Sequence, residues 1–225
     1  PNDWVTSATN YTFTVTSDYD GAYVTVTFVK TTPTPATQIT SLSEITDFTA
    51  TGNYELAADI DASGSNLGEF KGTLDGKHFT IRHLNHPLFA STDGATIRNI
   101  NFENVNISTG DANGDAGAIT SCAKGETRIY NCGILPTTTE YDADSNVIGF
   151  LGSSVGGSGN VGGLVGKLEG SARVINCFSY ANITGGNKVG GIVGWNSVAT
   201  NTNSEDAEHY LKTMVMNCMF YGDND

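Results

Sequence analysis

The sequence has few basic residues and no long apolar run. Its 225 residues include 11 Lys and Arg against 24 Asp and Glu, which gives a formal net charge of −13 at pH 7. Nucleic acids and anionic membranes are bound through clustered Lys and Arg. The basic residues of this chain are scattered, which argues against both partners. No apolar run approaches the roughly 18 residues that a membrane-spanning helix requires. We therefore expect no membrane span in this stretch.

Charged residues are also sparse, at 16%, whereas glycine is frequent, with 27 residues. This composition is atypical of helical bundles and favours β structure with many turns. No secretory signal is visible after Pro1. We therefore expect a trimmed fragment of a longer exported protein.

Two short motifs recur along the chain. A double-glycine motif occupies residues 162–166 as GGLVG and returns at residues 190–194 as GGIVG, 28 positions later. A second motif, an aliphatic segment that ends in Asn-Cys, occurs at residues 129–132, 174–177 and 215–218. Residues 97–100 fit this second template with Ile in the Cys position, and residues 81–84 fit it more loosely. A repeat of about this length indicates stacked structural units.

Each half-motif has the length and the β-branched content of a short strand, and its boundaries are turn residues. One such unit cannot bury an apolar face alone, but stacked units can, with each strand pairing in parallel with its equivalent in the next unit. The repeated Asn side chains then form a hydrogen-bonded ladder, and the repeated cysteines form a buried column of free thiols. The sequence therefore predicts an all-β fold, a right-handed parallel β-helix preceded by a short antiparallel β-hairpin segment.

The same residues resemble a known family. The segments GGLVG and GGIVG are similar to the GLUG repeat of large secreted and cell-surface bacterial proteins, and residues 54–61 and 70–81 resemble the entry segment of that family. The resemblance implies an adhesin-like parallel β-helix that is extracellular, either secreted or anchored at the outer membrane. In some immunoglobulin-cleaving metallopeptidases the repeat lies outside the catalytic domain.

The expected domain organisation has three parts. Residues 1–32 alternate with period two and predict a β-hairpin, either the tail of a preceding β-domain or a cap. Residues 33–37 form a proline-bearing linker. Residues 38–225 form the β-helix, with insertions near 133–160 and 197–212. A capping box at Ser41–Glu44 predicts a short helix that covers the first coil.

Catalytic and metal sites receive little support from the sequence. Asp59 and Asp61 have the spacing of two carboxylates on one strand face, as a glycosidase needs, but they also belong to the entry segment of the family. The acidic loops that begin at Asp59, Asp111 and Asp142 alternate oxygen ligands without the later glutamate of a calcium loop. Of the nearby histidines, His78 and His83 have opposite strand parity, which disfavours shared zinc ligation. We expect no enzyme activity, no metal and no cofactor.

Three aromatic residues are the candidate binding residues: Trp195, Tyr180 and Tyr210. Exposed aromatic rings on a solenoid can stack on sugars or anchor a protein partner. The sequence thus predicts a non-catalytic adhesion module that displays loops to a host or matrix glycan or protein. One alternative is a carbohydrate-active β-helix enzyme, either a polysaccharide lyase or a glycosidase. Another is an accessory domain of a large surface protease.

Overall fold

The computed structural model describes residues 10–16, 23–29, 35–108, 111–136, 139–141, 147–150, 152–197 and 213–222. The chain divides into two compact units, residues 1–35 and residues 36–225. In the first unit β1 (Asn10–Thr16) pairs antiparallel with β2 (Tyr23–Val29), as the alternating sequence predicts. Whether this hairpin ends a preceding domain or acts as a cap stays a prediction.

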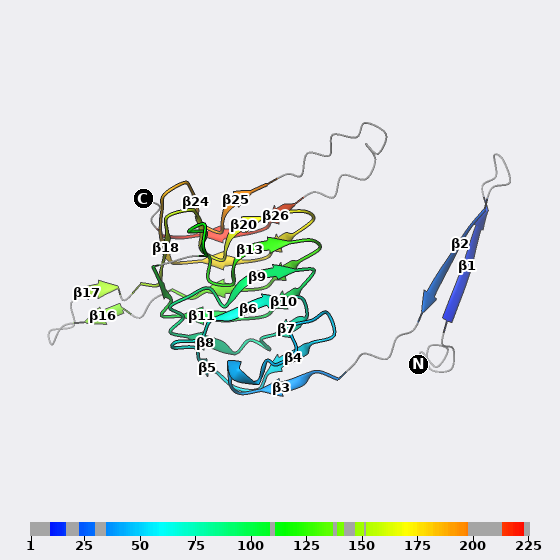
Figure 1. Cartoon of the computed structure of the whole chain (residues 1–225), viewed down its shortest axis with the longest axis horizontal. Coiled ribbons are helices and arrows are strands. Elements are labelled where there is room, and N and C mark those ends of the chain that lie inside the picture. Colours follow the sequence, from blue (N-terminus) through cyan, green and yellow to red (C-terminus); the bar gives the residue numbers. More distant parts are fainter. Residues whose placement is uncertain are drawn as a thin grey trace. The chain divides into compact units, whose positions relative to one another are not determined.

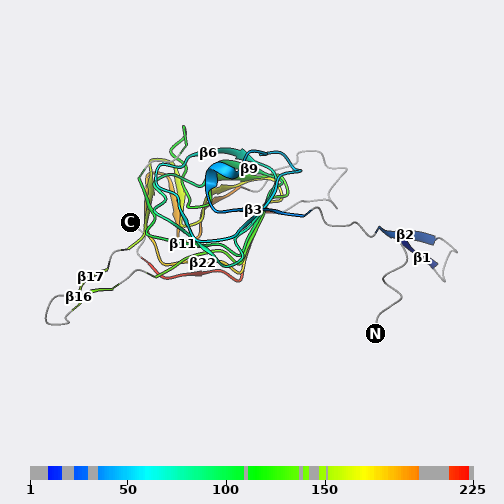
Figure 2. The ribbon, with the colours of Figure 1, turned by 90° about the horizontal axis from the view of Figure 1, so that it is seen from below.

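The second unit is a parallel β-helix, because strands from successive coils pair in parallel (Figure 1). Its largest sheet has seven strands: β3 (Thr37–Ile39), β4 (Asn53–Leu56), β7 (Thr73–Asp75), β10 (Thr96–Arg98), β14 (Arg128–Tyr130), β21 (Arg173–Ile175) and β26 (Met214–Met216). Each coil is named below after its strand in this seven-stranded sheet. When the structure is viewed from below, the coils superpose on a common outline (Figure 2).

Further parallel sheets complete the walls of the coils. The six-stranded sheet contains β5 (Ile60–Asp61), β8 (Thr80–Arg82), β11 (Asn101–Glu103), β15 (Gly133–Ile134), β22 (Phe178–Ser179) and β27 (Met219–Phe220). The five-stranded sheet contains β6 (Leu67–Phe70), β9 (Phe89–Asp93), β13 (Thr120–Lys124), β20 (Val165–Leu168) and β25 (Val193–Asn196). The later coils add a three-stranded sheet of β12 (Asn106–Ile107), β18 (Ser154–Gly157) and β23 (Asn182–Gly185), and a pair of β19 (Asn160–Gly162) and β24 (Lys188–Gly190).

Aliphatic columns fill the interior of the stack. In the seven-stranded sheet Leu74, Ile97, Ile129 and Val174 are paired in register on successive coils, and all four are fully buried. Their neighbours on the same strands point outward, as the two-residue period of a strand requires. A single continuous core therefore runs along the stack.

The corner between the seven-stranded and six-stranded sheets is made by the repeated asparagines. Asn99, Asn131, Asn176 and Asn217 all adopt left-handed backbone conformations, with φ of 53–55°. Asparagine tolerates this conformation better than other residues with a side chain. The Asn131 amide donates to the side-chain oxygen of Asn99 at 3.2 Å, and the Asn217 amide donates to that of Asn176 at 2.6 Å. The predicted asparagine ladder is therefore present in part, since two of the three successive pairs in this column are hydrogen-bonded.

His83 does not belong to this column, and its looser assignment to the Asn-Cys template was wrong. Strand register pairs Arg82 with Glu103, which places His83 opposite Asn104 at the following corner. Both residues have positive φ, 60° and 52°. In the β7 coil the first corner is instead made by the longer turn that contains Lys77 and His78.

The repeated cysteines occupy the predicted column. Cys132 and Cys177 are buried and Cys218 is partly exposed, and all four cysteines of the chain are free thiols. Each thiol of the column lies near a carbonyl oxygen of the coil before it, at 3.9 Å for Cys132, 4.0 Å for Cys177 and 3.7 Å for Cys218. The repeat of this contact shows that the three coils stack in register.

The double-glycine motif is required by close packing between coils. A Cβ on Gly163 would overlap the carbonyl oxygen of Gly191 and the side chain of Ser179. A Cβ on Gly166 would lie 2.6 Å from the carbonyl oxygen of Ser121. Larger residues at these positions would therefore push neighbouring coils apart.

The capping box forms as predicted, on a 3₁₀ turn at Leu42–Glu44. The Glu44 carboxylate accepts the backbone N–H of Ser41 at 2.8 Å, and the Ser41 hydroxyl accepts that of Ser43 at 3.4 Å. Leu42 and Ile45 are 2% and 3% exposed and belong to the core. The turn therefore seals apolar side chains of the N-terminal coils from water.

The segment 133–160 is only partly an insertion. Its ends, β15 and β18, are coil strands that pair in register with neighbouring coils. Between them, β16 (Thr139–Tyr141) and β17 (Val147–Phe150) form an antiparallel pair. The second predicted insertion, 197–212, lies outside the described residues except for Ser197. In the described parts of the chain, no helix has the length and apolar character needed to cross a membrane.

Candidate functional site

Charged side chains on the outside of the first coils are paired across coils. The Arg82 guanidinium lies 3.0 Å from Asp59 of the preceding coil and 2.6 Å from Glu103 of the following coil. These carboxylates raise the pKa of Arg82, with the hydrogen bond to Glu103 as the main cause. Similarly, Arg98 lies 2.8 Å from Asp75 and donates to the Tyr130 hydroxyl at 2.9 Å. These ion pairs connect adjacent coils and stabilise their stacking.

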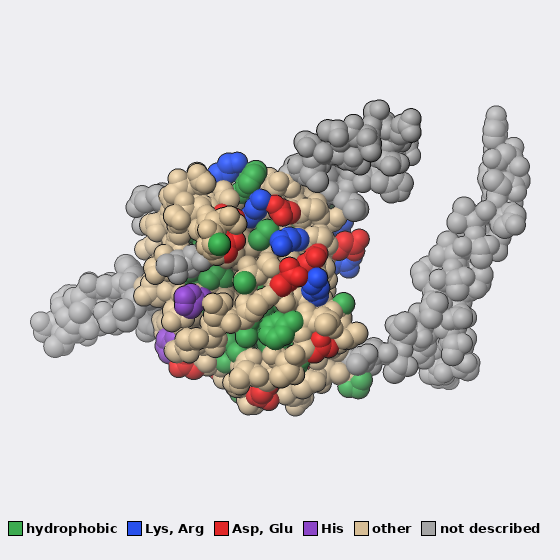
Figure 3. All heavy atoms as spheres, viewed as in Figure 1, with side chains coloured by type: hydrophobic (Ala, Val, Ile, Leu, Met, Phe, Trp, Pro, Cys, Tyr) green, Lys and Arg blue, Asp and Glu red, His purple; other side chains and the backbone are tan. Residues whose placement is uncertain are grey.

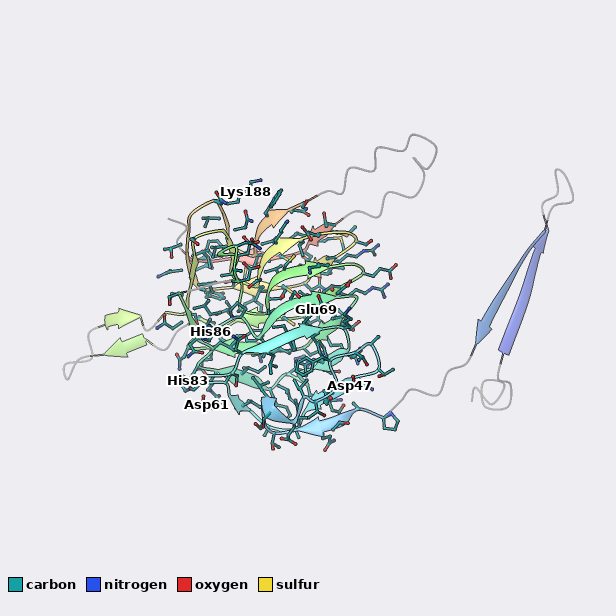
Figure 4. The ribbon with its side chains drawn as sticks, in the orientation of Figure 1. Asp47, Asp61, Glu69, His83, His86 and Lys188 are labelled. Atoms are coloured by element: carbon teal, nitrogen blue, oxygen red, sulfur yellow. The ribbon has the colours of Figure 1, made fainter. Side chains whose placement is uncertain are left out.

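Asp59 and Asp61 both have lowered pKa values, which differ from the pKa of a glycosidase general acid. The backbone N–H of Thr80 and the Arg82 guanidinium lower the pKa of Asp59. The Ser63 hydroxyl and backbone N–H, together with His83 at 3.2 Å, lower the pKa of Asp61 to about 2 (Figure 4). A general acid needs a raised pKa so that it carries a proton near neutral pH. The lowered pKa values of Asp59 and Asp61 therefore do not suit the role of a general acid.

The candidate metal loops use their oxygen atoms within the fold. One Asp111 carboxylate oxygen accepts the backbone N–H groups of Asn113 and Asp115, at 2.8 and 3.0 Å. Asp115 turns inward, where it accepts two hydrogen bonds from Asn160. Across the described stretches, no three His, Cys, Asp or Glu side chains converge as metal ligands. The loop that begins at Asp142 lies outside the described residues.

The outer face of the five-stranded sheet carries a dense mixture of charges (Figure 3). Glu69 binds Lys71 at 3.1 Å and Lys124 at 3.6 Å, and Lys71 also approaches Asp93 at 3.9 Å. Further along the stack Lys167 pairs with Glu169. Most charges of this face are therefore neutralised by neighbours from the same or an adjacent coil.

Trp195 lies on this face, on β25, directly in register with Lys167. The ammonium groups of Lys167 and Lys188 lie 4.6 and 3.9 Å from the centre of its ring. Both distances are within the range of cation–π attraction. Lys188 comes from β24, near the C-terminal end of the stack (Figure 4), and has no carboxylate within ion-pair distance among the described residues. The ring is partly exposed, and among the described residues the Lys188 ammonium is one of its contacts.

Tyr180 lies on another part of the surface, just after β22 of the six-stranded sheet. Its ring is 6.1 Å from that of Phe178 and 5.6 Å from that of Tyr221. The structure therefore does not bring Tyr180 and Trp195 into one site. Tyr210 lies outside the described residues. The binding roles of all three residues stay predictions.

The sequence-based choice of candidate binding residues did not include several exposed methionines near the end of the chain. Met214, Met216 and Met219 are 37%, 50% and 51% exposed, and Tyr221 is 72% exposed. The sequence pattern of residues 214–216 could have identified them. In this segment interior and exterior positions alternate in the same order as in the equivalent strands of the preceding coils. This pattern assigns Val215 to the interior and its two methionine neighbours to the surface.

Comparison with known protein families yields a match to the M26 IgA1-specific metallo-endopeptidase N-terminal region, over residues 28–134. The resemblance to the GLUG-repeat family was therefore wrong. The double-glycine and Asn-Cys motifs on which it rested have a structural explanation in the close contacts between coils and in the asparagine corners described above.

Curated relatives point in the same direction. An immunoglobulin A1 protease of Streptococcus sanguinis is 30% identical over 194 residues, which span 70% of this chain and 10% of that protein. An immunoglobulin A1 protease of Streptococcus pneumoniae serotype 4 is 29% identical over 179 residues, 70% of this chain and 8% of that protein. The zinc metalloprotease ZmpB of the same organism is 42% identical over 72 residues, 31% of this chain and 4% of that protein. The matched stretches thus span only 4–10% of the length of these relatives.

A solved structure shares the fold. It belongs to a candidate immunoglobulin A1 protease from Bacteroides ovatus, with a TM-score of 0.57 and 20% identity, and the match covers 84% of this chain and 59% of that one. The comparisons thus favour the accessory-domain alternative over the adhesion module that the sequence predicted first.

Proposed function

We propose that this chain is a non-catalytic β-helix module of a large extracellular bacterial metalloprotease, and that it contacts the protein that the protease cleaves. The observation that carries this proposal is the match of residues 28–134 to the N-terminal region of the M26 metallo-endopeptidases. The small share of each relative that the chain spans fits a module within a much longer polypeptide. Immunoglobulin A1, named in the descriptions of these relatives, is the proposed binding partner.

The side chains support a scaffold role. Arg82 and Arg98 connect successive coils through ion pairs, and Asp59 and Asp61 accept hydrogen bonds that lower their pKa values. Such groups stabilise a rigid stack, and a rigid stack holds a binding surface at a fixed distance from neighbouring domains.

Binding and catalysis can be tested with the purified chain. Immobilised immunoglobulin A1 should bind the chain saturably in biolayer interferometry, whereas immunoglobulin G should not. After prolonged incubation, the heavy chain of the bound immunoglobulin should remain intact on a denaturing gel. Cleavage by the chain alone would contradict the non-catalytic role, and a lack of binding would contradict the proposed contact.

A second candidate function is glycan contact, favoured by the surroundings of Trp195. The Lys188 ammonium, which has no ion-pair partner among the described residues, would suit the carboxylate of an acidic sugar, and the exposed part of the indole beside it would contact the sugar ring. A glycan array that includes acidic and neutral sugars tests this role. Binding of acidic glycans should be lost in Trp195→Ala and retained in Tyr180→Ala, and equal binding by both variants would exclude Trp195 as the contact.

A further inference from the structure

Among the residues of the β-helix coils whose side-chain exposure is described, the strongly exposed large hydrophobic side chains lie between positions 214 and 221. They are Met214, Val215, Met216, Met219 and Tyr221. Val215 belongs to the interior column, because it pairs in register with Val174, and its exposure follows from its place on β26, the end strand of the seven-stranded sheet. The other residues alternate with interior positions and therefore face outward. They lie on β26 and β27 or directly after them. Their outward direction, which does not depend on their place at the end of the stack, makes them candidates for an interaction site.

The outer columns change character along the stack. One column runs in register through Asp75, Arg98, Tyr130, Ile175 and Met216. It begins with a charged pair and ends with an aliphatic residue and a methionine. On the outer surface of this sheet, the early coils thus carry ion pairs and the late coils carry apolar side chains. Because the side chains of this column point outward, their apolar character does not serve the core.

The apolar side chains of the late coils form a connected surface. The ring of Phe178 lies against Gly133 of the preceding coil, where a Cβ would overlap it. Tyr180 contacts both Phe178 and Tyr221, and Phe178 pairs in register with Met219. We define the apolar flank as the outward-facing residues Ile175, Phe178, Tyr180, Met216, Met219 and Tyr221. Residues 213–222 include no Asp, Glu, Lys or Arg.

A basic residue borders this flank. Arg173 precedes Ile175 on β21 and pairs in register with Arg128 and Met214. Arg128 lies 3.6 Å from Glu126, but Arg173 has no carboxylate within ion-pair distance in the described part of the chain. A partner that covers the flank can therefore supply the missing negative charge. Complementary charge at the rim steers association and fixes orientation.

We propose that the apolar flank is a docking surface for a protein segment that carries aromatic or aliphatic side chains next to a carboxylate. The inference rests on the proposed function, since it assigns the immunoglobulin contact to this surface. Methionine and tyrosine suit the role, because methionine adapts its shape to a partner and tyrosine contributes a large contact area. A second copy of the chain fits less well, since each copy has a net charge of −13 and would place a second unpaired Arg173 at a symmetric contact.

The test uses the intact 225-residue chain, with immunoglobulin A1 as the probe. The double variant Met219→Ala/Tyr221→Ala removes exposed side chains, so the fold should be retained, with unchanged circular dichroism. Its dissociation constant should rise about tenfold or more, as expected for central interface residues. Arg173→Glu should slow association, most strongly at low ionic strength. Lys77→Glu, at a half-exposed position on the N-terminal coils far along the stack from the flank, is the charge-matched control that should bind like the parent chain.

Each outcome bears on a different claim. If the parent chain binds the immunoglobulin and the double variant binds equally well, the docking surface is overturned and the proposed function stands. If the parent chain does not bind, the proposed function fails and the docking surface fails with it. If light scattering shows a dimer of the parent chain that the double variant lacks, the occupant is a second copy, and the proposed partner is overturned. If the flank variants lose glycan binding but keep immunoglobulin binding, the occupant is a glycan, which also overturns it.

Discussion

The side-chain amide of Asn217 donates a 2.6 Å hydrogen bond to the side-chain oxygen of Asn176, its equivalent on the preceding coil. Both residues have a left-handed backbone, with φ of 53°. In this pair the asparagine side chain thus serves two purposes, since it permits the bend and bonds the neighbouring layer. These two contributions can be separated experimentally.

Replacement of Asn176 should show which contribution is larger. Asn176→Ala loses the hydrogen bond and places an unsuited residue at positive φ, which should lower the free energy of unfolding by about 1–3 kcal/mol. Asn176→Gly loses only the hydrogen bond and should be the less destabilised variant. Urea denaturation followed by circular dichroism measures both. Equal losses would show that the backbone conformation has no cost at this corner.

Substitution in the double-glycine motif should be much more damaging. Gly163→Ala introduces a methyl group that overlaps the backbone of Gly191, which cannot move without separating the coils. We expect a loss of about 3 kcal/mol or failure to fold. Gly68→Ala is the matched control, because a Cβ on Gly68 meets nothing within 4 Å. Comparable melting temperatures for the two variants would contradict the steric explanation.

The Asp61 carboxylate offers a test of its hydrogen bonds. Its pKa is lowered to about 2, with the Ser63 hydroxyl as the main cause. Ser63→Ala should therefore raise this pKa toward the usual range of aspartate, and a carboxyl NMR titration measures the shift. Because the pKa is depressed in the folded chain, the associated stability is present above the ordinary aspartate pKa. It is lost as the pH falls toward 2. An unchanged pKa in Ser63→Ala would show that another donor dominates.

The thiols should be nearly inert in the folded protein. Burial, together with Glu169, raises the pKa of Cys122 to about 12. Hydrogen bonding with the Cys132 thiol likewise raises the pKa of Cys177 to about 12. At pH 8 these thiols are then almost entirely protonated, and the thiolate is the form that reacts. A disulfide reagent such as DTNB should react slowly with the native chain, fastest at the partly exposed Cys218, and rapidly with all four thiols in guanidinium chloride. Rapid reaction of Cys177 in the native chain would contradict its burial.

The β-helix could be predicted because its repeats are local sequence patterns. The Asn-Cys segments predict asparagine side chains that bond between coils and a column of cysteines, and both are found in the structure. The capping box at Ser41–Glu44 is equally local. These features depend on a few neighbouring residues and on the stacking of equivalent residues in successive coils.

Other features depend on the register between coils, which cannot be derived from the sequence. Residues 154–162 resemble a Gly- and Ser-rich loop, yet they form β18 and β19, because they pair with strands of the next coil. The position of His83 depends in the same way on which residue of the next coil it faces. The ion pairs of Arg82 join residues 21 and 23 positions away, so they emerge only when the length of each coil is known. The apolar flank likewise combines residues from several coils.

The corner that follows the six-stranded sheet differs in length between coils. In the β10 coil it consists of Asn104 and Val105, whereas in the β14 coil the chain leaves after β15, forms the β16–β17 hairpin and returns at β18 in register with β12. Stacking therefore imposes no fixed length on this connection. For protein engineering, this corner is the natural graft point, where an epitope or a reporter domain can replace residues 139–150 while the layers on either side keep their alignment.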